Sequence, residues 1–163
     1  MMIRETLPRS PYLAKTCPEA PVGLVIVRAG GRANAMTVSF FSEVAHHPTS
    51  MWISIERSTQ THSLLLEAGA FSFVTLERKQ AAIALECGFH SGRDRDKCKT
   101  LPLYDNGGGF LFLRDAIAST ACRIERTVPL GAHTLFIAHI LSGDAQSARR
   151  PLRNLLLSDL QAL

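Results

Sequence analysis

Residues 22–39, VGLVIVRAGGRANAMTVS, predict the first structural unit of this chain. They open with a β-branched, apolar run that favours a buried strand. The glycine pair at 30–31 is a hairpin turn signal, so residues 32–39 are expected to return as the paired strand. The returning strand carries Thr37 and Ser39, whose hydroxyl groups share one side because side chains alternate along a strand. The role of these two hydroxyl groups has to be inferred from the rest of the sequence.

Further elements follow from hydrophobic periodicity and turn signals. Residues 51–56 alternate cleanly, with the odd-numbered side chains expected in the core. A Ser/Thr cluster before residues 63–69 is a helix-start signal, and an Ala-rich helix is expected over residues 79–87. Residues 40–47 show no clean alternation and are expected to form a short helical or irregular turn. The remaining expectations are an irregular lead-in over residues 1–20, strands at 71–76, 110–113, 121–128 and 133–141, a long loop over 88–109, and a short helix or closing strand in the Leu-rich tail after Gly143.

The composition and the order of elements limit the fold class. The chain has 163 residues, of which 46% are hydrophobic and 20% charged, as is typical of one globular domain with its own core. Short strands outnumber helices and do not alternate with them as in βαβ units. The sequence has no GxGxxG motif after a strand, no P-loop and no HExxH motif. The order therefore favours a mainly β fold, a closed antiparallel barrel with helices packed at its side.

Several classes of function fit the sequence poorly. The net charge of +4 comes from scattered Lys and Arg residues, and aspartates interrupt the most basic run, so no nucleic-acid surface is expected. The four cysteines lack metal-site spacing, so we expect reduced thiols and no metal. No apolar run approaches a membrane span and the charged N-terminus resembles no signal peptide, so we expect no membrane partner and a cytoplasmic location.

Residues 53–64 carry the clearest local signal for a ligand site. They run from a strand through a hydroxyl-rich turn into a helix start, where free backbone N–H groups and the helix dipole favour an anion. Ser58, Thr59 and Thr61 add hydroxyl groups, and Arg57 adds a positive charge. The alternative is that these hydroxyls cap the helix without binding a ligand.

Five segments, in this order and at these spacings, resemble a known family. They are PVGLVIV (21–27), NAMTVSFFSEVAHHPTSMWISIERSTQTHSLL (34–65), GAFSFVTLERKQ (69–80), HSGRDRDKC (90–98) and GAHTLFIAHI (131–140). Together they resemble the flavin reductase-like family of FMN-binding split barrels over roughly residues 20–141. The resemblance implies a mainly β, closed antiparallel split β-barrel with flanking helices, in a single domain over residues 1–163.

The resemblance also implies a site. The strand at 34–39 would run beside the isoalloxazine ring and the ribityl chain, and the segment at 54–61 would hold the rest of the ribityl chain and the phosphate. The loop at 91–97 would lie near the flavin, with Lys97 as a second charge for the phosphate. The resemblance thus implies cofactor-binding roles for Asn34, Ala35, Met36, Thr37, Ser39, Ser54, Ile55, Glu56, Arg57, Ser58, Thr61, Ser91, Arg93 and Lys97, and a catalytic role toward the nicotinamide for His133.

Two positions depart from the family pattern. The family commonly has an acid where this chain has Ala132, and an aromatic residue where Cys98 follows Lys97. The missing acid removes a hydrogen-bond partner near His133. The alternative role for His133 is therefore a hydrogen-bonded histidine that begins a strand.

The resemblance implies an oxidoreductase with non-covalent FMN, or FAD as the other flavin, that uses NADH or NADPH to reduce flavin. Because the cofactor supplies the chemistry, the protein's part is orientation and polarity. Reduced flavin would pass electrons to a monooxygenase or another acceptor, and the functional unit would be a homodimer. Two alternatives remain open: a flavoredoxin-like FMN electron carrier without its own NAD(P)H activity, and a non-catalytic flavin-binding module.

Overall fold

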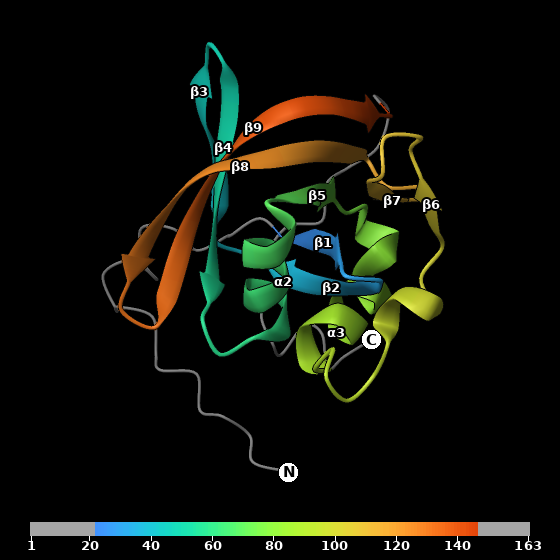
Figure 1. Ribbon diagram of the computed structural model, residues 1–163. Helices are drawn as coiled ribbons and strands as arrows, with labels where there is room; N and C mark the ends of the chain where they lie inside the picture. The colour runs from blue at the N-terminus through green and yellow to red at the C-terminus, as the bar shows by residue number, and fades with distance from the viewer. Residues whose placement is uncertain (1–21, 147–163) are drawn as a thin grey trace, which may run out of the picture.

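The computed structural model describes residues 22–146 of the chain (Figure 1). Its main element is a seven-stranded antiparallel sheet with the order β2-β1-β5-β8-β9-β4-β3, accompanied by a two-stranded sheet of β6 and β7. Figure 1 shows β8 and β9 as two long, curved strands, and β9 pairs with β4 along the sheet. The strands are β1 (Gly23–Ala29), β2 (Arg32–Val38), β3 (Phe41–His46), β4 (Thr49–Glu56), β5 (Ala70–Thr75), β6 (Leu103–Asp105), β7 (Leu111–Leu113), β8 (Ala118–Leu130) and β9 (His133–Ala145); the helices are α2 (Gln60–Ala68), α3 (Ala81–Phe89) and the 3₁₀ turns η1 (Arg78–Gln80) and η2 (Lys97–Lys99).

The hairpin predicted from residues 22–39 is confirmed as β1 and β2. Gly30 and Gly31 form its turn with φ values of +54° and +74°, which glycine adopts without steric cost. The apolar run of β1 is continuous because both of its faces are covered. One face joins a core with α2, β4 and β9, and the other face joins a core with α3.

The inward residues predicted for β4 are also confirmed. Met51, Ile53 and Ile55 are buried in the core that α2 covers. Their neighbours along the strand are half-buried on the opposite side, which we call the outer face of β4 and β9.

The prediction for residues 40–47 is wrong, because the segment forms the edge strand β3. It pairs with β4, and the register shifts between Glu43 and Ala45. Such a bulge places two residues opposite one, which breaks the alternation that a strand otherwise shows in sequence. The loop expected over 88–109 is also too long, since it contains η2 and β6.

The helices expected over 63–69 and 79–87 both exist with different limits. α2 begins at Gln60, three residues earlier than expected, and Gly69 ends it in the left-handed conformation, as predicted. α3 begins at Ala81 after the turn η1 and continues to Phe89, past the expected stop at Gly88.

The mainly β, antiparallel class is confirmed. Within residues 22–146, β2 and β3 are the two edges of the sheet and no pairing joins them, so closure of the barrel stays a prediction. The single domain over residues 1–163 and the cytoplasmic location also stay predictions. The lead-in at 1–20 and the tail beyond residue 146 lie outside the described residues. Over the same described range, no helix is long and apolar enough to cross a membrane.

Candidate functional site

The helix start predicted as an anion site is the N-terminus of α2. Its cap is Thr59, whose side chain accepts a hydrogen bond from the backbone N–H of His62 at 3.2 Å and donates to the Glu56 carbonyl at 2.8 Å. The two preceding N–H groups, of Gln60 and Thr61, have no acceptor within the helix because of helix geometry. No acidic residue lies in the first turn, so no carboxylate of the helix itself neutralises the positive end of its dipole.

Asn34 of β2 fastens this helix start to the hairpin. Its Nδ2 donates to Thr61 Oγ1 at 2.9 Å, and both side chains are buried. The Thr61 hydroxyl is therefore turned toward β2 and does not cap the helix. Asn34 and Thr37 lie on opposite faces of β2, since Thr37 Oγ1 donates to the Ala84 carbonyl of α3 at 2.6 Å.

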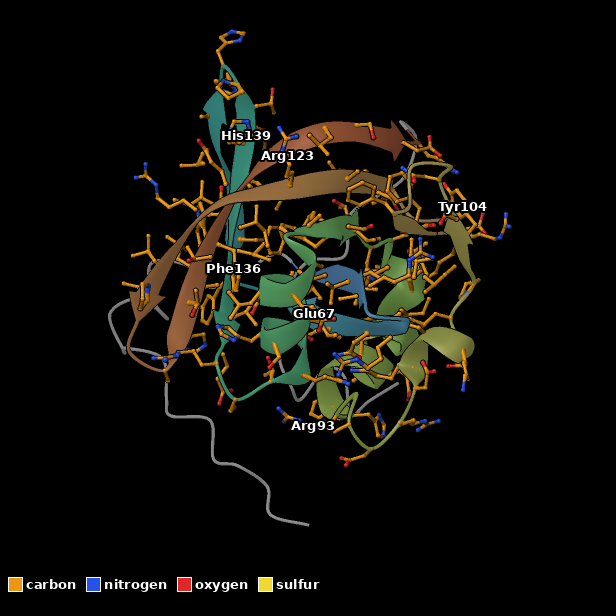
Figure 2. All side chains as sticks on the ribbon, viewed as in Figure 1. Glu67, Arg93, Tyr104, Arg123, Phe136 and His139 are labelled. Atoms are coloured by element: carbon orange, nitrogen blue, oxygen red, sulfur yellow. The ribbon has the colours of Figure 1, made fainter. Side chains whose placement is uncertain are left out.

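The loop at 91–96, which we call the strap, closes over the same helix start. Arg93 Nη1 donates to the Ser58 carbonyl at 2.9 Å. Gly92 lies so close to Asn34 and Gln60 that a methyl group in its place would overlap both side chains. Figure 2 shows Arg93 at the lower edge of the molecule, far from Tyr104 and His139. Three segments distant in sequence thus meet at one point.

Lys97 lies at a different helix end. Its Nζ donates to the carbonyls of Cys87 at 3.2 Å and His90 at 2.8 Å, which are the last acceptors of α3. The side chain is only 2% exposed, and burial lowers the pKa of Lys97. The structure places this charge at the C-terminus of α3, and a role toward a phosphate stays a prediction.

His133 begins β9 on the outer face, opposite Glu56 of β4. Its ring meets the ring of Phe40 edge-on, with the centroids 6.3 Å apart. The carboxylate of Glu56 accepts a hydrogen bond from Ser58 Oγ at 2.6 Å. Ala132, which replaces the expected acid, accepts the backbone N–H of Arg57 at 2.8 Å through its carbonyl. The substitution therefore leaves the backbone contact between the two turns in place.

His62 is a buried polar residue that the sequence did not single out. Its Nε2 lies 2.8 Å from Thr134 Oγ1, and its ring meets Phe136 edge-on at 5.5 Å between centroids. Burial, and secondarily the charge of Arg57, lower the pKa of His62. The residue joins the first turn of α2 to the start of β9.

The predicted residues fall into three groups. Asn34, Ser58, Thr61, Ser91 and Arg93 meet at or beside the start of α2, with Arg57 in the preceding turn. Ser54, Glu56 and His133 share the outer face. The other predicted residues point elsewhere or are covered: Ala35 and Ile55 are buried in the two cores, Met36 packs against the α2-side core, Thr37 bonds α3, Ser39 lies between β2 and β3, and Lys97 caps α3.

Sequence reasoning missed Gln60, His62 and Gly92 as members of the site. A glycine between Ser91 and Arg93 in a charged loop is the signal that was available for Gly92, because glycine permits close backbone approach. For Gln60 and His62, no local pattern distinguishes a side chain that meets a distant loop or strand from one on a solvated helix face.

A cavity of about 330 Å³ lies away from this site, near the β6–β7 pair. Tyr104, Arg114, Ser119 and Asp144 are among its lining residues, and Tyr104 donates to Asp144 Oδ2 at 3.4 Å. None of the residues predicted from sequence lines it. Among residues 22–146, no cluster of His, Cys, Asp and Glu suits a metal ion, and the absence of a metal stays a prediction.

Comparison with known proteins shows the family of this chain. Residues 17–158 match the flavin reductase like domain. The chain is 33% identical over 122 residues to the reductase component of an FADH2-dependent resorcinol hydroxylase from Rhizobium sp. (strain MTP-10005), covering 74% of this chain and 67% of that protein. It is 31% identical over 121 residues to an NADH-dependent flavin reductase of Pseudomonas fluorescens, covering 74% and 68%.

A solved structure supports the fold. The FMN-binding protein of Thermus thermophilus superposes with a TM-score of 0.79 at 24% identity, covering 93% of this chain and 86% of that one. The family match spans most of the chain, and the first relative exceeds 30% identity over more than two thirds of it. This chain belongs to the flavin reductase-like domain family.

Proposed function

We propose that this protein binds FMN without a covalent link and uses NADH or NADPH to reduce flavin. The observation that carries the proposal is the meeting of the α2 N-terminus, Asn34 and Arg93 at one point. The naming of the Pseudomonas fluorescens relative as an NADH-dependent flavin reductase supports the reaction.

The start of α2 suits the phosphate of FMN. The N–H groups of Gln60 and Thr61 and the uncompensated helix dipole favour a negative charge. The guanidinium of Arg93 lies beside Ser58 in the same turn and adds a full positive charge. The capping alternative for Ser58 is weakened because Thr59 already occupies the cap position.

The outer face suits the flavin ring. Ser54, Glu56 and His133 lie there on neighbouring strands, and Phe40 contacts His133. When bound, the flavin supplies the hydride chemistry. The part of the protein is to hold the ring against β4 and to present the His133 imidazole, which can donate or accept a hydrogen bond, on the side where the nicotinamide arrives.

A partner protein and a second subunit complete the proposal. The Rhizobium relative is named as the reductase component of a hydroxylase, which supports delivery of reduced flavin to a monooxygenase, with FAD as the other flavin. Val44, Leu130 and Leu141 are exposed apolar side chains on β3, β8 and β9. A homodimer that covers them accounts for their exposure.

One observation favours a second candidate, a flavoredoxin-like carrier without NAD(P)H activity. Ala132 leaves His133 without the acidic neighbour that the family commonly has. Binding of flavin would be the same for both candidates, since Ala132 contacts the turn before α2 only through its backbone carbonyl, which an acidic residue would also supply.

The purified protein tests both candidates. Absorption near that of oxidised flavin, with acid release of a compound that co-elutes with FMN, is the expected result. Steady-state oxidation of NADH and NADPH with added FMN is expected for the reductase and absent for the carrier. A protein that stays colourless with excess FMN and shows no thermal shift would overturn the proposal.

A further inference from the structure

The cavity beside the β6–β7 pair has no part in the proposed flavin site. Strands β6 and β7 contribute Tyr104 and Leu113 to its lining, the turn before β8 contributes Arg114, and the end of β9 contributes Asp144. Figure 2 shows Tyr104 and Arg93 at separate edges of the molecule. At about 330 Å³, the cavity is large enough to hold a small molecule.

Hydrogen bonds of the fold fix the walls of this cavity. The Arg114 N–H donates to the Pro102 carbonyl at 3.0 Å, and the Arg114 carbonyl accepts from Gln80 Nε2 at 3.2 Å. The N–H of Gln146, another lining residue, donates to the Ile117 carbonyl at 2.7 Å. Because the walls are already ordered, a ligand would bind with little loss of conformational entropy.

One lining residue has an uncommon backbone conformation. Asp115 has a φ of +59°, and it is the one non-glycine residue with a positive φ within residues 22–146. The β-carbon of an L-residue is crowded in this conformation, so the fold retains it at a cost. Residues held in such conformations concentrate at ligand sites. The turn at 114–117 therefore has a second feature, independent of the cavity itself, that favours a binding role.

The cavity holds two opposite charges that are not paired with each other. The guanidinium of Arg114 lies over the Tyr104 ring, with Cζ 5.0 Å from the ring centroid. The Tyr104 hydroxyl donates to Asp144 Oδ2 at 3.4 Å. Burial, and secondarily the charge of Asp144, raise the pKa of Tyr104, so the phenol keeps its proton near neutral pH. Among the ion pairs of residues 22–146, none joins Arg114 to a carboxylate.

A guanidinium and a carboxylate in one cavity select the charges of their ligand. Arg114 offers N–H donors in a planar fork that matches a carboxylate, and Asp144 can accept from an ammonium group. The buried side chains of Leu113 and Ala116 also line the cavity and suit an aliphatic group. A ligand that carries both charges uses both contacts, whereas a ligand with one charge uses only one of them.

We propose that this cavity is a binding site for a small zwitterion of the amino-acid class, with the ligand's carboxylate on Arg114 and its ammonium group on Asp144. The site goes beyond the proposed function, because neither residue takes part in the contacts proposed for flavin. It therefore stands or falls separately from flavin binding.

Titration of the full chain with L-leucine tests the site, and the amide chemical shifts of the protein report binding. Two analogues each lack one charge: isocaproate has no ammonium group, and isoamylamine has no carboxylate. L-Leucine should shift the amides of residues 113–119 and 144–146. Each analogue should bind at least about tenfold more weakly than L-leucine, as expected for a lost hydrogen bond between charged groups.

Arg114→Met and Asp144→Asn test the two contacts. Both side chains are exposed, and asparagine keeps an oxygen for Tyr104, so the melting temperatures should change little. Each variant should bind L-leucine about tenfold more weakly. Arg114→Met should not weaken isoamylamine, and Asp144→Asn should not weaken isocaproate, because each analogue lacks the group that the changed residue binds.

Arg123→Met is the matched control, since Arg123 is an exposed arginine of β8 that does not line the cavity. It should leave the affinity for all three ligands unchanged. The proposal is overturned if L-leucine causes no shifts at the cavity, or if either analogue binds as tightly as L-leucine. An unchanged affinity for L-leucine in Arg114→Met or in Asp144→Asn would overturn it equally.

Discussion

Helices α2 and α3 each have nine residues and pack against opposite faces of the same β-hairpin, yet their polar surroundings differ. At α3, Lys97 donates to the carbonyls of Cys87 and His90 at the helix end, and Thr37 donates to the Ala84 carbonyl. The one side-chain oxygen of this helix that makes no hydrogen bond within residues 22–146, Glu86 Oε1, lies 3.2 Å from the charged Arg95 Nε. At the start of α2, Asn34 Oδ1 and Gln60 Oε1 have no hydrogen-bond partner within residues 22–146, and the first turn of the helix contains no acidic residue.

We expect this difference to separate a helix end that serves the fold, at α3, from one that binds the proposed ligand, at α2. A polar group that the fold has already satisfied gains little from a ligand, whereas an unsatisfied one gains a full hydrogen bond. Lys97, Arg93 and Thr37 looked alike in sequence as polar residues of one flavin site. Their partners now assign Lys97 and Thr37 to α3 and Arg93 to α2, and each assignment can be tested by substitution.

The largest effect is expected for Lys97→Met. The variant removes the charged donor from the buried Cys87 carbonyl and from the part-buried bond to the His90 carbonyl, so the free energy of unfolding should fall by about 1.5–3 kcal/mol. Urea denaturation measures the change. Lys99→Met is the control, because Lys99 is exposed and its ion pair is with Asp96 at 3.4 Å; the change should cost less than about 1 kcal/mol.

Flavin titration of the Lys97 variant sharpens the comparison. If Lys97 serves only α3, the ratio of FMN to riboflavin affinity stays as in the wild type. A selective loss of FMN would place a phosphate contact on Lys97 and remove the distinction between the two helix ends.

Arg93→Met should act on binding. The guanidinium lies beside the start of α2, so FMN should bind about tenfold more weakly, equivalent to about 1.4 kcal/mol. Riboflavin, which lacks the phosphate, should change by less than about twofold. Arg95→Met, in the same strap but paired with Glu86, is the control and should leave the ratio unchanged. Equal losses of both flavins would move the phosphate away from α2.

Thr37→Val tests whether the polar row on β2 serves the fold or the flavin. The hydroxyl donates to the Ala84 carbonyl, so its loss should cost about 0.5–1.5 kcal/mol of unfolding free energy and leave FMN affinity unchanged. Thr49→Val is the control, since that hydroxyl donates at the exposed β3–β4 turn. Weaker FMN binding with intact stability would return Thr37 to the flavin site.

The sequence predicts features that arise from local pattern. The β1–β2 hairpin, the inward residues of β4 and the presence of a helix at the Ser/Thr cluster all follow from periodicity and turn residues within about a dozen positions, although the helix begins three residues before the expected Ser63. The edge strand β3 was missed because its bulge removes the alternation. The position of the strap (residues 91–96) over the start of α2 was not predictable from sequence, since the contacts of Gly92 and Arg93 join residues more than thirty positions apart.

Lys97 is a second residue whose contacts could not be predicted from local sequence. The resemblance implied a position near the flavin, and the structure places the residue at the start of η2, directly after the strap. The direction of its ammonium group depends on where α3 ends, two residues later than the periodicity indicates. A helix end is the least certain part of a helix in sequence, so the partner of a residue that caps it is uncertain too.

The smallest effect is expected for His62, which joins the first turn of α2 to Thr134 at the start of β9. Its pKa lies below the ordinary value of 6.5 because burial disfavours the charged ring and Arg57 repels it. Below pH 6.5 the unfolded chain therefore binds a proton that the folded chain refuses. Stability from this residue is complete above about pH 6.5 and is lost as the pH falls through the lower folded value. One proton limits the slope to about 1.4 kcal/mol per pH unit.

Urea unfolding of the wild type and of His62→Gln tests this expectation, because glutamine keeps an amide near Thr134 but does not titrate. The free energy of unfolding of the wild type should fall more steeply as the pH is lowered. The difference between the two proteins isolates His62 from the other histidines. Parallel curves from pH 5 to 8 would mean that α2 and β9 separate enough to hydrate the ring, and that the start of α2 is less firmly held than its contacts with β2 and β9 indicate.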